Sequence, residues 1–79
     1  MKVEILTPNS CLFKGEAQSV SVPSMEGPFT MLEHHAPIVA ILEAGDVILT
    51  DLHDEQQRFA IKGGFCEQHD NHIIICAEL

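Results

Sequence analysis

Turn-forming residues divide the sequence into short segments, and this spacing most strongly limits what the chain can fold into. Glycine, proline, asparagine and aspartate recur at short intervals along the whole chain. The segments between them are rich in Val, Ile and Leu, and residues 17–22 alternate apolar with polar side chains. Segments of this length suit strands and are too short for most helices. The pattern therefore predicts an all-β chain.

Eight to ten short strands are expected, and two of their connections read as hairpins. The expected strands are residues 3–6, 11–14, 17–22, 29–32, 38–42, 47–50, 57–62, 65–68 and 73–77. The polar tips 51–56 and 69–72 lie between apolar runs, and Asp70-Asn71 is suited to a tight hairpin turn. Strands of this number and spacing predict an all-β sandwich or a small barrel, formed as a single domain over residues 1–79.

One stretch, residues 31–44, is long and apolar enough to compete as a helix. Pro37 lies at its centre, and a proline inside a helix costs about 3 kcal/mol or more. The residue before it, Ala36, is biased towards extended geometry. We therefore expect strands on both sides of Pro37.

The charge and the cysteines exclude several classes of protein. Twelve acidic and four basic residues give a net charge of −8, which argues against a nucleic-acid partner and against unaided binding to an anionic membrane. No apolar run reaches the length of a transmembrane helix, and the opening MKVEIL does not resemble a signal peptide. We expect no direct membrane insertion. The three cysteines lack the density of a disulfide scaffold and favour a reducing compartment.

A small zinc-stabilised β domain is one alternative that the residues leave open. Cys66, His69 and His72 superficially resemble a zinc ligand set. They lie across an expected hairpin, where period-2 geometry places their side chains awkwardly. The fourth ligand would have to be one of four other residues: His34, His35, His53 or Cys11. The prediction is that these histidines are exposed and that no metal is bound.

No other pattern indicates chemistry. His34 and His35 are expected on an extended segment, where neighbouring side chains point to opposite faces. Gly63-Gly64 is not followed by a phosphate-loop pattern, so we interpret it as a break that needs positive φ or close backbone approach. A generic β-sandwich binding module stays open, but four Phe without Trp or Tyr supply little aromatic platform. No catalytic or cofactor-binding residue is predicted.

Residues 22–37 resemble the sequence pattern of a known family, and further matches before and after them extend this resemblance over the whole chain. They read VPSMEGPFTMLEHHAP and resemble the pattern V-P-x-x-E-G-x-F-G-V-L-P-x-H-A-P of the N-terminal β-sandwich domain of the ATP synthase epsilon subunit, called delta in mitochondria. The rest of the resemblance lies in residues 3–8, Phe13-x-Gly15, Leu42-x-x-Gly45 with Val47, residues 63–65, and residues 72–75 with Ala77. The chain departs from the pattern at three positions: Thr30, Glu33 and Ala44.

The resemblance implies a small flattened β-sandwich that serves as a non-catalytic rotor subunit without a cofactor. Such a subunit docks gamma onto the ring of c subunits in the central stalk and couples ion-driven rotation to ATP synthesis. It would lie peripherally at the cytoplasmic face of the bacterial inner membrane. The resemblance ends at Leu79, so we expect no C-terminal helical hairpin and assign neither ATP binding nor inhibition of rotation.

The same resemblance assigns two interfaces. The c-ring interface would comprise Ser24, Met25, Glu26, Gly27 and Pro28. The gamma interface would comprise His35, Ile38 and Ala40. From composition alone, the apolar residues of the first loop could equally be packed against the domain.

Overall fold

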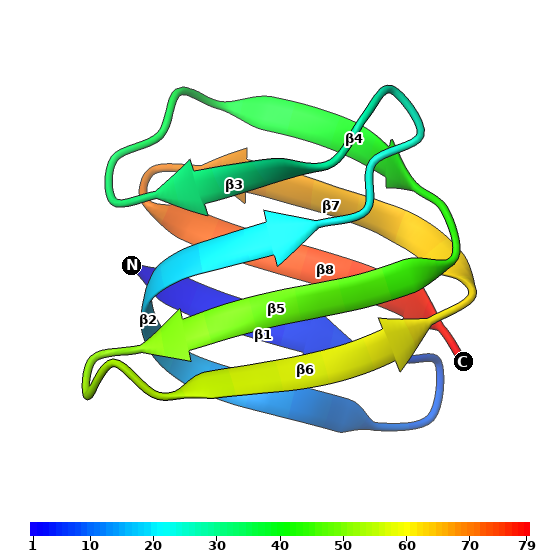
Figure 1. Cartoon of the computed structure of the whole chain (residues 1–79), viewed down its shortest axis with the longest axis horizontal. Coiled ribbons are helices and arrows are strands. Elements are labelled where there is room, and N and C mark those ends of the chain that lie inside the picture. The colour runs from blue at the N-terminus through cyan, green and yellow to red at the C-terminus, as the bar shows by residue number, and fades with distance from the viewer.

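Eight strands and no helix make up the computed structural model, which describes all of residues 1–79 (Figure 1). The strands are β1 (Lys2–Leu6), β2 (Cys11–Val22), β3 (Phe29–Leu32), β4 (Ile38–Leu42), β5 (Gly45–Asp51), β6 (Gln56–Ile61), β7 (Gly63–His69) and β8 (His72–Glu78). There is accordingly no helix with the length and hydropathy needed to cross a membrane. The all-β prediction is confirmed, with the number of strands at the low end of the expected range.

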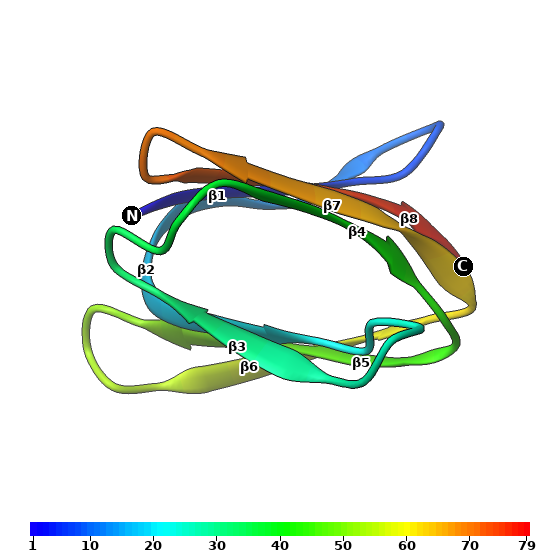
Figure 2. The same ribbon diagram turned by 90° about the horizontal axis from the view of Figure 1, so that it is seen from above.

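The strands form two layers that face each other, which confirms the predicted sandwich (Figure 2). One layer has the order β4-β7-β8-β1, followed by the first half of β2. The other has β3, the second half of β2, β5 and β6. All neighbours are antiparallel except β1 and β8, which run parallel.

Strand β2 belongs to both layers because a bulge bends it. Up to Glu16 it pairs with β1, and from Ala17 onwards it pairs with β5 and β3. The register with β5 shifts between Ala17 and Ser19, so Gln18 is the extra residue, as in a β-bulge that turns a sheet corner. The prediction of two separate strands here is wrong, because Gly15 pairs with Val3 inside the ladder instead of ending a strand.

The core lies between the layers and is built from alternate residues of each strand. Fifteen buried hydrophobic residues form one cluster. In β8, for example, every second residue is buried, as period-2 geometry requires. The largest fully buried side chains of the cluster are Ile5, Met31, Leu49, Ile73 and Ile75.

Both predicted hairpins are present, and the second is closed by the expected residues. Strands β5 and β6 flank one tip, and β7 and β8 flank the other. Asp70 and Asn71 have φ values of 51° and 59°. Two consecutive residues with positive φ are the mark of the tight turn that matches the twist of paired strands.

Gly64 lies inside β7, so the expected chain break at Gly63-Gly64 is wrong, but the expected backbone role is confirmed. Gly64 has a φ of 142°. A Cβ atom there would lie 2.1 Å from the carbonyl oxygen of Cys76 on β8. A side chain at this position would separate the two strands.

Replacing Gly64 with alanine is therefore expected to destabilise the domain by about 3 kcal/mol or more, since it combines backbone strain with a collision. Urea denaturation would measure the change. The matched control is Gly27→Ala, because Gly27 also has positive φ, at 120°, but nothing lies within 4 Å of its added Cβ. A cost for Gly64→Ala no larger than that of the control would contradict the close approach.

Phe65 follows this glycine, and the structure shows that it is not a core residue. Its side chain is 44% exposed on the outer face of the first layer. We expect Phe65→Ala to cost about 1 kcal/mol or less, compared with about 2–5 kcal/mol for Leu49→Ala at a fully buried position. Thermal denaturation of the two variants side by side gives the comparison, and equal losses would show that Phe65 is buried in solution.

Candidate docking groove

A groove of about 660 Å³ lies between the β2–β3 loop and β4. The loop and the end of β4 lie side by side near the top of Figure 1. Its walls are Ser24, Met25, Glu26, Gly27, Phe29, Ile38, Val39, Ala40 and Ile41. The lining is mainly apolar, and Glu26 is its one charged residue. A concave apolar surface with a single carboxylate is suited to binding rather than to bond chemistry.

The loop that forms one wall is a tight turn organised by Ser24. The amide of Gly27 donates to the Ser24 carbonyl at 3.0 Å, and the amide of Glu26 donates to the Ser24 hydroxyl oxygen at 3.2 Å. Ser24 is buried, whereas Met25 is 63% exposed. The turn thus holds its own serine inside and presents Met25 and Glu26 outwards.

Two backbone hydrogen bonds fasten this turn to β4. The amide of Met25 donates to the carbonyl of Ile41 at 3.0 Å, and the amide of Glu43 donates to the carbonyl of Pro23 at 2.8 Å. Ser24 and Leu42 form an isolated antiparallel bridge between these bonds. The loop and the strand consequently form one surface.

The groove brings together most of the residues that the resemblance assigned to two interfaces. The wall contains four of the five c-ring residues and two of the three gamma residues, with Pro28 and His35 outside it. Three further wall residues were not among the named interface residues: Phe29, Val39 and Ile41. Val39 and Ile41 are 70% and 58% exposed. Five consecutive apolar residues in β4 were the available signal, but a buried strand would give the same run.

His34 and His35 lie in a turn, so the expectation of an extended segment is wrong. His34 has a φ of 60°, and the amide of His35 donates to the Leu32 carbonyl at 3.1 Å. The His35 ring lies beside Phe29, with ring centroids 6.4 Å apart. The His34 side chain is 81% exposed. His35 therefore lies next to Phe29 of the groove wall without being part of that wall, while His34 points to solvent.

The possible zinc ligands are not gathered. Cys66 is fully buried, whereas the His69 side chain is 68% exposed. His72 is engaged elsewhere, with its Nε2 2.8 Å from Glu4 Oε2. No three His, Cys, Asp or Glu side chains in the structure converge as a metal site would need. Burial also raises the pKa of the Cys66 thiol, which disfavours the thiolate that binds metal.

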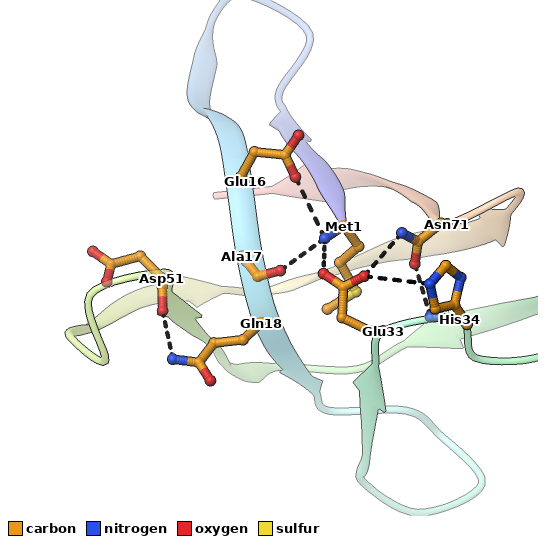
Figure 3. A network of polar contacts seen from close by, with 8 residues as sticks. All are labelled: Met1, Glu16, Ala17, Gln18, Glu33, His34, Asp51 and Asn71. Carbon is orange, nitrogen blue, oxygen red and sulfur yellow. Dashed lines mark hydrogen bonds and ion pairs between the residues drawn. The ribbon is translucent and has the colours of Figure 1, made fainter.

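Glu33 anchors the loop that carries His35, and Figure 3 shows its contacts. One carboxylate oxygen accepts a hydrogen bond from the Met1 ammonium, and the other accepts one from Asn71 Nδ2 at 2.9 Å. Asn71 Oδ1 in turn accepts from the His34 amide at 2.8 Å. The Met1 ammonium also donates to the Ala17 carbonyl at 3.0 Å. The β3–β4 loop is thus joined to β1, the bend of β2 and the β7–β8 turn.

The charges in this cluster shift each other's pKa. Burial disfavours the charged ammonium of Met1 and taken alone would lower its pKa, but the hydrogen bonds to Glu33 and Glu16 outweigh it and raise the pKa above 8.0. The ammonium, together with Asn71, lowers the pKa of Glu33 below 4.5. The ammonium stabilises the fold below pH 8.0 and loses this as the pH rises through its raised pKa. Glu33 contributes above pH 4.5 and loses this as the pH falls through its lowered pKa.

The difference in melting temperature between the wild type and Glu33→Gln is accordingly expected to be largest between pH 4.5 and 8.0. It should shrink on both sides of this window as one partner loses its charge. Thermal melts at several pH values test this, with Glu55→Gln on the exposed β5–β6 loop as the control. A difference that does not vary with pH would show that the ion pair does not form in solution.

The sequence comparisons agree with the resemblance. The family model of the ATP synthase delta/epsilon chain, β-sandwich domain, matches residues 1–79. The chain belongs to this family. It is 38% identical to the ATP synthase epsilon chain of Chlorobium limicola over 98% of its own length and 88% of that protein. It is 36% identical to the epsilon chain of Salinibacter ruber over 99% of its length, but it spans only 58% of that relative. The epsilon chain is a non-catalytic subunit, as the resemblance predicted.

Solved structures show the same fold at lower sequence identity. The epsilon-family domain matches a chain of the mitochondrial ATP synthase of Euglena gracilis with a TM-score of 0.89 and 19% identity, covering 95% of the domain and 48% of that chain. It matches a chain of the Tetrahymena thermophila mitochondrial ATP synthase with a TM-score of 0.83 and 15% identity, covering 99% and 63%. The sandwich is therefore preserved where little of the sequence is shared.

Proposed function

We propose that this epsilon-family domain is a rotor subunit of the ATP synthase central stalk, which docks gamma onto the c-ring and couples ion-driven rotation to ATP synthesis. The observation that carries the proposal is the groove, because it unites residues assigned to both interfaces on one surface. The Tetrahymena structure with the same fold is described as central stalk and c-ring, and the Euglena structure includes the c-ring. As part of that assembly, the domain would be peripheral to the membrane, at its cytoplasmic face.

Within this proposal, the Ser24 turn is the part that meets the c-ring. Met25 and Glu26 project from it into solvent, and Gly27 and Pro28 complete its exposed tip. The Glu26 carboxylate suits a polar or basic loop on the partner. His35, Ile38 and Ala40 would meet gamma on the adjoining part of the groove.

The contacts of the turn also suit the transmission of torque. A load on the turn passes through the Met25–Ile41 hydrogen bond into one layer and through the end of β2 into the other. Since β2 runs through both layers, the two sheets resist the load together. A domain with few mobile segments is better suited to this task than a hinged one.

The direct test is capture of partners by the tagged 79-residue chain from detergent-solubilised membranes of the source organism. Recovery of gamma and c subunits with ATPase activity in the eluate is the expected result. A folded chain that captures neither subunit would overturn the proposal.

The mutation Glu26→Lys is expected to weaken this capture about tenfold or more by placing a positive charge against the partner, while the isolated domain keeps its melting temperature. Glu55→Lys is the matched control, because it makes the same charge change on the exposed β5–β6 loop, away from the groove. If both variants capture gamma and c subunits as the wild type does, Glu26 is not at an interface.

A further inference from the structure

Strand β4 lies at the edge of its sheet, and three of its five residues have no partner strand on that edge. On one side β4 pairs with β7 along its whole length. On the other side, the Ser24 turn covers only the end from Ile41 to Glu43. Ile38, Val39 and Ala40 have no neighbouring strand there. An open strand edge offers backbone hydrogen-bonding groups to another chain.

The direction of these backbone groups follows from the two hydrogen bonds that cover the end. The carbonyl of Ile41 and the amide of Glu43 both point away from β7, towards the Ser24 turn. Successive residues of a strand direct their backbone groups to alternate sides. The N–H and C=O of Val39 therefore also point to the open edge, while those of Ile38 and Ala40 point to β7.

We propose that an extended segment of gamma adds to β4 as a further strand, exchanging hydrogen bonds with the N–H and C=O of Val39, which lies between the predicted gamma-facing residues Ile38 and Ala40. This inference rests on the proposed function and specifies how the groove holds its partner. The added strand would run along the mouth of the groove, since Val39 and the strand residues beside it are part of its wall. One side chain of the segment would enter between the Ser24 turn and β4.

The chemistry of the wall defines that segment. Met25, Phe29, Ile38 and Ala40 suit an apolar side chain, and the one charged wall residue, Glu26, suits a basic neighbour. The four basic residues of the chain all lie outside the wall: Lys2, Lys14, Arg58 and Lys62. A second copy of this chain is disfavoured as the added strand, because each copy carries a net charge of −8 and its own Glu26.

The edge limits how much strand can be added. Pro37 has no N–H to donate, and the Ile41 carbonyl already accepts from Met25. Val39 is therefore the central backbone contact of a short addition. The effect of losing this backbone hydrogen bond can be separated from the effect of losing the Val39 side chain by comparing two variants at this position.

The test compares Val39→Pro with Val39→Ala. Both remove the exposed valine side chain, but only proline removes the N–H that faces the open edge. Edge strands tolerate proline at such a position, and Ile38 before it is already extended. Binding would be measured by biolayer interferometry to the source organism's ATP synthase catalytic sector stripped of its epsilon chain. Val39→Pro is expected to bind about tenfold or more weakly than Val39→Ala.

Amide hydrogen exchange of the wild type gives a readout that does not depend on a variant folding. The Val39 amide is expected to exchange fast in the free domain and to become protected in the complex. The Ala40 amide, which points to β7, is expected to be protected in both. No added protection of Val39 in the complex would overturn the strand addition.

The outcomes separate this inference from the function on which it rests. Wild-type binding with equal affinities for Val39→Pro and Val39→Ala would overturn the strand addition alone and leave the rotor function standing. No binding of the wild type to the stripped sector would overturn both. Protection of Val39 by self-association, seen as a dimer in sedimentation, would show that a second copy adds to β4 and would also overturn the proposal.

Discussion

The whole sandwich depends on the bend of β2 at Gln18. This one strand supplies the pairing edge for β1 in the first layer and for β3 and β5 in the second. The extra residue at the bulge is held by a hydrogen bond of 2.8 Å from its side-chain amide to the Asp51 carbonyl. Met1 pairs with Ala17 in both directions at the same point, so the start of β1 secures the bend. Without the bend, the two halves of β2 could not close one core between them.

The groove forms on the side of the sandwich where the two layers end in β3 and β4. β3 and β4 lie in different layers and are joined by a loop instead of by pairing (Figure 2). The Ser24 turn partly closes this side by bonding to the end of β4. What stays open is a short apolar edge with a carboxylate beside it, which is a suitable place for a partner and a poor place for catalysis.

Polar contacts at the opposite end of β3 hold the loop that completes this surface. Glu33 stands where the related pattern has proline. Its carboxylate joins the Met1 ammonium and Asn71, and so it restrains the loop through contacts instead of through a fixed backbone angle. The same loop places His35 beside Phe29. The position of the predicted gamma-facing histidine therefore depends on a cluster of charges that lies away from the groove.

The sequence by itself determined the family, the all-β class and both hairpins. These follow from local patterns: residues 22–37, the recurring turn formers, and Asp70-Asn71 between apolar runs. It also identified Gly64 as a backbone position, since a pair of glycines has few other roles. The tertiary structure alone decided that β2 is one strand, that Phe65 faces out and that Gln68 faces in. It also decided that Val39 lies on an open edge. Each of these depends on which distant strand pairs with which, and the side chains of a single strand do not specify that choice.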